Sequence, residues 1–324
     1  MYDYFMEKFV YQMFILGTGE NISEALTKGL GGVIYFTRDI KSKEQFIKLI
    51  QENKSKALIP PFLSIDQEGG RVERTENIHE RYLSPRYAFA KGEEFLRNQT
   101  NLIAEELNGY GINLNFAPCA DVNTNPNNPI IGERAFSDKT EDVIKGVNIA
   151  SEIYKHKGII PCIKHYPGHG DADKDSHKTL PQIDLPLSSM EDIHIKPFKY
   201  AVENNADMIM AAHLHCTCFD KEVIPASLSK NAIGYLRNNL NYNGVIISDD
   251  MVMKGVQGYG NIEAVIMGIE AGLDMFIFRD ADNETLETIE KIIITAEKNE
   301  KLKQRIFESN KRIQQLKKKY NIIK

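Results

Sequence analysis

Residues 159–181 read IIPCIKHYPGHGDADKDSHKTLP, a short apolar run followed by a loop dense in histidine, aspartate and glycine. The apolar run, residues 159–163, predicts a buried strand, and Pro167, Gly168 and Gly170 argue against regular structure directly after it. A buried strand that ends in a loop of titratable groups is where parallel α/β proteins place their chemistry. A solvated surface loop is the alternative, because loops hold both solvent and function. The density of histidine and aspartate favours function.

Seven further apolar runs resemble residues 159–163 in length and composition. The eight together are residues 12–16, 32–36, 61–65, 112–117, 159–163, 207–211, 244–247 and 273–278. Because these runs are continuously apolar and do not alternate with polar residues, they predict strands that are buried on both faces, as in a parallel sheet.

Amphipathic stretches of helical length separate the apolar runs. They are residues 41–55, 96–110, 138–156, 189–204, 229–239, 261–271 and 283–298. Eight strands that alternate with about eight helices predict an α/β fold of the (β/α)8 TIM-barrel type. A doubly wound open sheet is the alternative, since the number of strands alone does not separate the two folds.

The domain organisation follows from length and composition. The chain has 324 residues and contains no linker rich in glycine, serine or proline, so we expect one catalytic domain over residues 1–324. Residues 299–324 predict a lysine-rich terminal helix that packs on the barrel, with its charges on a solvated face.

Net charge and cysteine content limit which partners and which cellular compartment we expect for the protein. The net charge of −5 argues against nucleic acid or an anionic membrane as a partner. The N-terminus lacks a signal-peptide pattern and no apolar run approaches membrane-span length. Four cysteines without a Cys-x-x-Cys pair suggest buried thiols in a reducing, cytoplasmic setting. Cys216 and Cys218 could instead form a metal or redox pair, although one such pair is a weak signal.

Polar side chains follow five of the predicted strands. In chain order they include Asp66, Asp121 with Arg134, Lys164 with His165, His213, and Asp249. Each alone could be an ordinary loop or capping residue. In a barrel, however, the carboxyl ends of all strands meet at one rim, so these groups should converge on one site.

Asp175 and His177 form a second chemical signal in the loop after residues 159–163. A carboxylate close to an imidazole can hold its tautomer and raise its basicity. This pairing makes histidine a usable acid or base near neutral pH.

Five motifs occur in a fixed order along the chain. They are Asp-Gln-Glu-Gly-Gly-Arg-Val at 66–72, Gly-Glu-Arg-Ala-Phe at 132–136, Lys-His-Tyr-Pro-Gly-His-Gly-Asp at 164–171, Asp-Ser-His at 175–177 and Ser-Asp-Asp-Met at 248–251. Over roughly residues 13–280, this set closely resembles the bacterial β-N-acetylhexosaminidases of glycoside hydrolase family 3. Family-3 β-glucosidases share the barrel plan, but they lack the Asp-Ser-His loop that is present here.

The resemblance implies a retaining exo-β-N-acetylglucosaminidase that removes terminal β-linked GlcNAc from peptidoglycan fragments or chitooligosaccharides. It implies Asp249 as the nucleophile that forms a covalent glycosyl-enzyme, His177 as the acid/base and Asp175 as its dyad partner. The implied sugar-binding residues are Asp66, Arg74, Arg134, Lys164 and His165. The chemistry agrees, since a retaining glycosidase needs a carboxylate and a proton donor on opposite sides of the scissile bond.

The resemblance also suggests a cytoplasmic enzyme of peptidoglycan recycling. We expect a monomer that needs no cofactor or metal and has a small sugar as its sole partner. The Leu214–Cys218 segment departs from the family pattern.

Three alternatives remain at this stage. A phosphorylase would use phosphate in place of water at the same site. A metal-dependent barrel hydrolase would use as ligands His165, His169, His213, His215 and Asp249. A non-catalytic sugar-binding protein could share the fold, because fold alone does not imply function.

Overall fold

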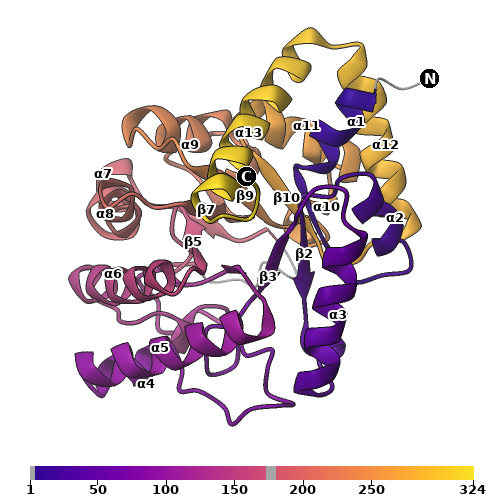
Figure 1. Ribbon diagram of the computed structural model, residues 1–324. Helices are drawn as coiled ribbons and strands as arrows, with labels where there is room; N and C mark the ends of the chain where they lie inside the picture. Colours follow the sequence, from indigo (N-terminus) through magenta and orange to yellow (C-terminus); the bar gives the residue numbers. More distant parts are fainter. Residues whose placement is uncertain (1–3, 173–179) are drawn as a thin grey trace.

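Eight parallel strands close into a barrel in the computed structural model, which describes residues 4–172 and 180–324 (Figure 1). In order around the barrel they are β1 (Phe14–Gly17), β2 (Gly32–Tyr35), β3 (Phe62–Ile65), β4 (Leu114–Asn115), β5 (Ile160–Tyr166), β7 (Met208–Ala211), β9 (Val245–Asp250) and β10 (Met275–Phe278). Each predicted apolar run supplies one strand. The last strand pairs with the first, with Phe14 opposite Phe276, so the barrel prediction is confirmed and the open sheet is excluded.

Helices surround the strands (Figure 1). They are α1 (Tyr4–Tyr11), α2 (Ile22–Thr27), α3 (Lys43–Lys56), α4 (Pro85–Ala90), α5 (Glu93–Tyr110), α6 (Thr140–His156), α7 (Leu187–Ser189), α8 (Lys196–Glu203), α9 (Lys230–Gly234), α10 (Lys254–Gln257), α11 (Asn261–Ala271), α12 (Asn283–Glu297) and α13 (Glu300–Lys319). The predicted helices are present, although π-helical turns interrupt two of them at Met190–His194 and Tyr235–Asn239. The sequence analysis missed α1 and several short helices, which span too few residues to show a clear period.

Polar side chains fix where several helices begin. Ser42 accepts a hydrogen bond from the amide of Gln45 at the start of α3, at 3.2 Å. Asp282 does the same for Thr285 at the start of α12, at 2.8 Å. Each cap satisfies an amide that the first helical turn leaves without a partner.

The strands are continuously apolar in sequence because both of their faces are buried in the core. Side chains from β1, β3 and β10, among them Phe14, Phe62 and Phe276, have no exposed surface. The rings of Phe14 and Phe276 lie 5.8 Å apart across the closing pair of strands. A barrel strand faces the interior on one side and the helices on the other, so both of its faces must be apolar.

The last helix, α13, packs on the barrel beside α1, as predicted (Figure 1). Its Asn310 donates a hydrogen bond to the carbonyl of Phe9 at 2.8 Å, and the rings of Phe9 and Phe307 lie 5.1 Å apart. Arg312 of α13 pairs at 3.0 Å with Asp274, a fully buried carboxylate just before β10. The helix therefore covers the amino ends of the strands and leaves the carboxyl ends open.

A small second sheet lies outside the barrel. β6 (Gln182–Ile183) pairs in parallel with β8 (His215–Cys216). The barrel strand β7 ends at Ala211, so His215 belongs to this small sheet. Among the helices of the described residues, none is long and apolar enough to cross a membrane.

Candidate active site

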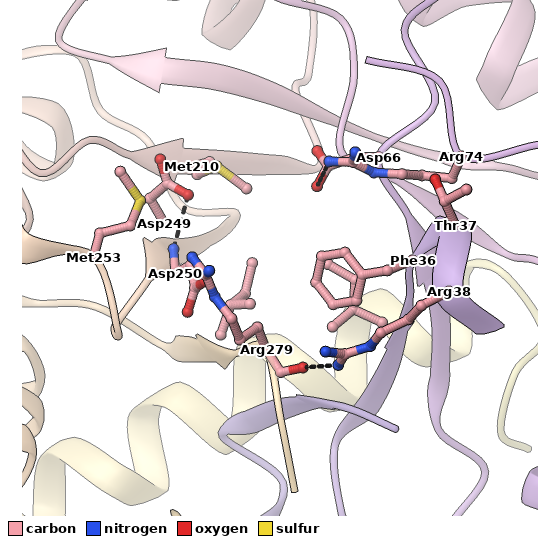
Figure 2. A pocket seen from close by; sticks show the side chains of 12 residues that line it. Phe36, Thr37, Arg38, Asp66, Arg74, Met210, Asp249, Asp250, Met253 and Arg279 are labelled. Carbon is pink, nitrogen blue, oxygen red and sulfur yellow. Dashed lines mark hydrogen bonds and ion pairs between the residues drawn. The ribbon is translucent and has the colours of Figure 1, made fainter. Parts of the chain in front are cut away.

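Polar residues gather at the carboxyl ends of the barrel strands. Asp66 directly follows β3, Lys164 and His165 lie in β5, and Asp249 lies in β9. Asp66 and Asp249 border a cavity of about 400 Å³ (Figure 2), and all four residues line an adjoining hollow of about 140 Å³. Predicted residues that line one or both are Asp66, Arg74, Arg134, Lys164, His165 and Asp249. The barrel thus brings together the six predicted site residues that fall in its described part.

Asp249 lies where both spaces meet and accepts a hydrogen bond from the amide of Asp250 at 2.7 Å. Burial alone would raise the pKa of this carboxyl. The imidazoles of His165 and His213, then the amide of Asp250 and the ammonium of Lys164, outweigh burial, so the pKa of Asp249 falls below its usual value. Asp249 is therefore ionised at neutral pH, as a nucleophile requires.

Burial raises the pKa of Asp250 above its usual value, against the pull of Arg279, which is 2.5 Å away. The two adjacent aspartates thus differ in environment. Asp250 is engaged by Arg279, whereas Asp249 borders both spaces.

Glu68 holds two cations at the bottom of the site. The guanidinium of Arg134 binds it in a fork, with Nε 2.9 Å from Oε2 and Nη2 2.8 Å from Oε1. Lys164 Nζ lies 2.7 Å from Oε1 of Glu68 and 2.5 Å from Oδ1 of Asp66. Burial alone would raise the pKa of Glu68, but Arg134 and Lys164 hold it well below its usual range. Buried charges persist only when paired in this way, so both cations have fixed positions.

The same network links two loops and a strand. Glu68 follows β3, Arg134 follows β4 and Lys164 belongs to β5. Asp66 reaches further, because Arg74 Nη2 lies 3.8 Å from its Oδ2. The ring of Phe36 lies between Arg74 and Arg38, 5.8 Å and 5.3 Å from their guanidinium carbons (Figure 2).

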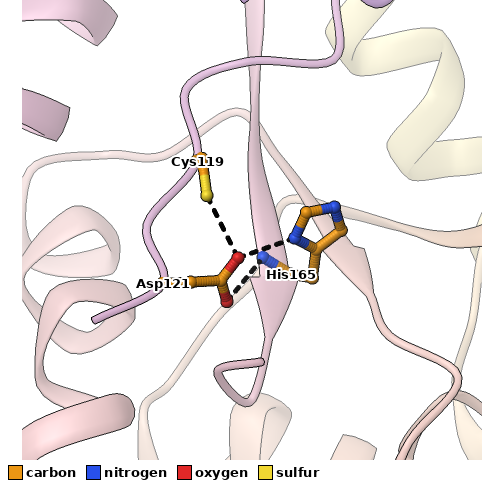
Figure 3. Close-up of side chains that lie close together, drawn as sticks. All are labelled: Cys119, Asp121 and His165. Carbon is orange, nitrogen blue, oxygen red and sulfur yellow. Dashed lines mark hydrogen bonds and ion pairs between the residues drawn. The ribbon is translucent and has the colours of Figure 1, made fainter. Parts of the chain in front are cut away.

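His165 has a defined tautomer. Arg134 Nη2 lies 3.1 Å from Nε2 of the imidazole, and a guanidinium can only donate, so Nε2 accepts. Nδ1 must then carry the proton, which it donates to Oδ2 of Asp121 at 2.7 Å (Figure 3). Asp121 therefore orients His165 at the wall of the hollow.

Asp121 also binds the loop that follows β5. Its Oδ1 accepts the amide of His169 at 2.6 Å, and the thiol of Cys119 donates to its Oδ2 at 3.1 Å. Gly170 is required beside it, because a Cβ there would come within 1.8 Å of the carbonyl oxygen of Val122. The loops after β4 and β5 thus hold one another in place.

Asp175 and His177 lie outside the described residues, so their predicted roles stay predictions. The chain on the amino side is well anchored. Ala172 is fully buried, and Asp171 accepts a hydrogen bond from Thr124 at 2.7 Å.

The family can be named from a sequence profile described as "Glycosyl hydrolase family 3 N terminal domain", which matches residues 6–316. The chain belongs to glycosyl hydrolase family 3. The resemblance stated from the motifs is thereby confirmed.

Curated relatives of this family-3 chain include two β-hexosaminidases. That of Photobacterium profundum is 35% identical, over 76% of this chain and 73% of the relative. β-Hexosaminidase A of Pseudoalteromonas piscicida is 32% identical, over 78% of this chain but only 46% of the relative. The predicted class, a glycoside hydrolase of the β-N-acetylhexosaminidase type, agrees with both names.

Solved structures lead to the same family. A family-3 β-N-acetylglucosaminidase from a Paenibacillus species superposes with a TM-score of 0.93 at 31% identity. The match covers 98% of this chain and 62% of that protein, so the family-3 chain spans less than two thirds of this neighbour.

Sequence reasoning gave no role to two residues of the family-3 site, Glu68 and Asp121. Glu68 belongs to the Asp66–Val72 motif, so its position near the site could be predicted from the sequence, whereas its ion-pair partners could not. Asp121 was noted only as a polar residue after a strand. Its link to His165 joins residues 44 apart in the chain, for which no spacing rule exists.

Two of the histidines that the metal hypothesis named as ligands are hydrogen-bonded to other groups of the protein. His213 Nδ1 lies 2.7 Å from the hydroxyl of Ser227, and His215 Nδ1 lies 3.2 Å from the carbonyl of Ile224. Over residues 4–172 and 180–324, the group of three side chains close enough to share an ion is Cys119, Asp121 and His165. Cys119 and His165 both donate hydrogen bonds to Asp121, so the carboxylate at the centre of the group is already satisfied without an ion (Figure 3).

Proposed function

We propose that this chain is a retaining exo-β-N-acetylglucosaminidase that removes terminal non-reducing β-linked GlcNAc. The observation that carries the proposal is the ionised carboxylate of Asp249 at the meeting point of two connected spaces. The smaller space, lined by Lys164, His165 and Arg134, suits a sugar with several hydroxyl groups. The larger space suits the group on the other side of the scissile bond.

In the proposed mechanism, Asp249 attacks the anomeric carbon of the bound GlcNAc. The bond to the leaving oxygen breaks as the glycosyl-enzyme forms, and His177 gives its proton to that oxygen. His177 then takes a proton from water, which attacks the anomeric carbon and releases Asp249. Two displacements at one carbon retain its configuration.

The other site residues would bind the sugar. The paired cations Lys164 and Arg134 cannot move far from Glu68, so they offer fixed hydrogen-bond donors. Asp66 accepts from sugar hydroxyls while it stays bound to Lys164. Rigid placement of this kind lowers the entropy cost of reaching the transition state.

Peptidoglycan fragments are the proposed natural substrates, with chitooligosaccharides second. Arg38 and Arg279 are about half exposed and border the larger cavity, where they could meet an acidic aglycone. A cytoplasmic location, a role in peptidoglycan recycling and a monomeric state belong to the same proposal.

A slow fluorinated N-acetylglucosaminide tests the mechanism. We expect a covalent adduct on Asp249, found by mass spectrometry of the digested protein, because Asp249 is ionised and borders both spaces. Asp250 is the internal control, since Arg279 engages it. An adduct on Asp250, or inversion of the anomeric configuration by NMR, would contradict the proposal.

The same assay separates water from phosphate as the acceptor. Hydrolysis of an aryl N-acetyl-β-glucosaminide should proceed at the same rate with or without added phosphate. Formation of GlcNAc 1-phosphate would identify the enzyme as a phosphorylase instead.

A further inference from the structure

Cys216 and Cys218 lie at a sharp turn in the segment that departs from the family pattern. Cys216 ends β8, and its carbonyl accepts the amides of Phe219 at 3.1 Å and Asp220 at 3.3 Å. The chain therefore folds back directly after Cys216. A turn of this kind brings residues two apart to within the roughly 4.4–6.8 Å between Cα atoms that a disulfide needs.

The two thiols contact each other but differ in access. Cys216 is 2% exposed, whereas Cys218 is only partly buried and packs against the apolar cluster that holds Cys216. The proximity of the two thiols lowers the pKa of Cys218 and raises the pKa of Cys216, and burial raises the latter further. The negative charge therefore forms on the sulfur that solvent reaches, where a thiolate can act as a nucleophile.

We propose that Cys216 and Cys218 form a modification site that reacts with low-molecular-weight disulfides and closes to an intramolecular disulfide. The Cys218 thiolate attacks one sulfur of the small disulfide, whose S–S bond breaks and releases one half as a thiolate. Cys216 then gives up its proton and attacks Cys218 Sγ, which releases the second half as a thiol. The two cysteines are oxidised, and the small disulfide is reduced to two thiols.

The surroundings favour this chemistry over metal binding. The carboxylate of Asp220, the nearest charged group in sequence, already accepts hydrogen bonds from Ser229 and Asn231. In the described residues, the potential three-ligand group lies elsewhere, at Cys119, Asp121 and His165. Two thiols without further ligands fall short of the four that a structural zinc site uses.

The position of the pair in the fold explains the difference in access. Cys216 belongs to a satellite apolar cluster, separate from the barrel core, that also holds Ile183 of β6 and Met190. Cys218, which is only partly buried, packs against this cluster. One thiol is thus held inside and the other is presented outside, the arrangement of a resolving and an attacking cysteine.

The test treats the folded protein with oxidised glutathione, then alkylates the remaining thiols and maps them by mass spectrometry. Wild-type protein should lose two hydrogen atoms in the peptide that carries Cys216 and Cys218 and take up no alkyl group there. Cys119 and Cys162, both without exposed surface, are internal controls that should stay reduced.

Single variants separate the two roles. Cys216→Ser should stop at a stable glutathione adduct on Cys218, because nothing resolves it. Cys218→Ser should leave Cys216 unmodified, since the remaining thiol is buried. The proposal is overturned if Cys218 stays reduced in wild type, or if Cys216 in Cys218→Ser reacts as fast as the wild-type pair. Circular dichroism confirms that both variants are folded.

Discussion

At the scale of single residues, Asp121 decides which nitrogen of His165 carries its proton. The carboxylate accepts from Nδ1 at 2.7 Å, which leaves Nε2 to accept from Arg134. The protein itself therefore fixes the orientation and tautomer of His165.

Replacing Asp121 with asparagine should disturb this arrangement. An amide can donate to Nδ1, which would move the proton to Nε2 and set it against the N–H of Arg134. We expect kcat/KM to fall on the order of 10- to 100-fold, the usual effect of removing a partner that orients a functional histidine. Steady-state kinetics on an aryl N-acetyl-β-glucosaminide measure this loss.

Cys119→Ala is the matched control for Asp121→Asn. It removes another hydrogen bond to the same carboxylate but leaves the tautomer of His165 unchanged. A similar loss of kcat/KM in both variants would show that Asp121 only stabilises the fold.

His177 supports a second prediction at this scale, resting on the family resemblance. His177→Ala should lower turnover on the order of 10²–10⁴-fold for a poor leaving group, because the departing oxygen then lacks a proton. The rate of glycosyl-enzyme formation from an aryl glycoside with an activated phenol as leaving group should change little, because that phenolate needs no proton. Pre-steady-state kinetics with both substrates measure the difference. Equal losses for the two leaving groups would mean that His177 binds substrate instead.

At the scale of elements, a buried lysine of α13 lies where this helix packs on the barrel. Lys317 has no exposed surface, and its Nζ lies 2.9 Å from both Gln12 Oε1 and the Pro60 carbonyl, neither of them charged. The ring of Phe62 lies 5.0 Å from the same nitrogen. Burial lowers the pKa of Lys317 to about 7.

The depressed pKa predicts how stability changes with pH. An unfolded lysine has a pKa of about 10.4, so from about pH 7 to 10 the unfolded chain holds a proton that the folded chain lacks. The free energy of unfolding should therefore rise with pH in this window, by up to about 1.4 kcal/mol per pH unit. Urea unfolding at several pH values should show this slope in wild type and lose it in Lys317→Met.

The exposed neighbour Lys318 provides the control. Lys318→Met should keep the wild-type slope, because this side chain is not buried. Parallel slopes for wild type and Lys317→Met would show that Lys317 stays charged in the folded protein.

At the scale of the whole molecule, buried carboxylates should set the acid limit of stability. The pKa values of Glu68 and Asp121 are held well below their usual range despite burial, by Arg134 and Lys164 for Glu68 and by His165 for Asp121. Their stabilisation is complete above the unfolded values of about 4.3 and 3.9. It should be lost as pH falls from there toward the folded values.

Glu68→Gln tests this acid limit. The variant should be less stable than wild type at pH 7, by about 3–5 kcal/mol, because Arg134 and Lys164 lose their buried partner. Its free energy of unfolding should then fall less steeply than that of wild type below about pH 4. Glu222→Gln, at an exposed position, should behave as wild type. If Glu68→Gln and wild type lose stability in parallel, the acid limit lies in other groups.

The strands, and the end of the sheet that carries the polar residues, could be predicted from the sequence. Continuous apolar runs such as residues 159–163 predicted strands buried on both faces, and Asp249 follows such a run. A parallel sheet and the edge that bears the site were therefore predictable, while an open sheet stayed an alternative to the barrel. The motifs were enough to place the chain in its family.

The contacts between distant polar groups could not be predicted from the sequence and are visible only in the folded chain. The Glu68–Arg134 fork joins residues 66 apart, and Lys317 reaches Gln12 across 305 residues. No local period or spacing encodes such pairs, because they form when barrel closure brings distant loops together. The same holds for Cys216 and Cys218, two residues apart in sequence, whose unequal burial depends on the apolar cluster that surrounds Cys216.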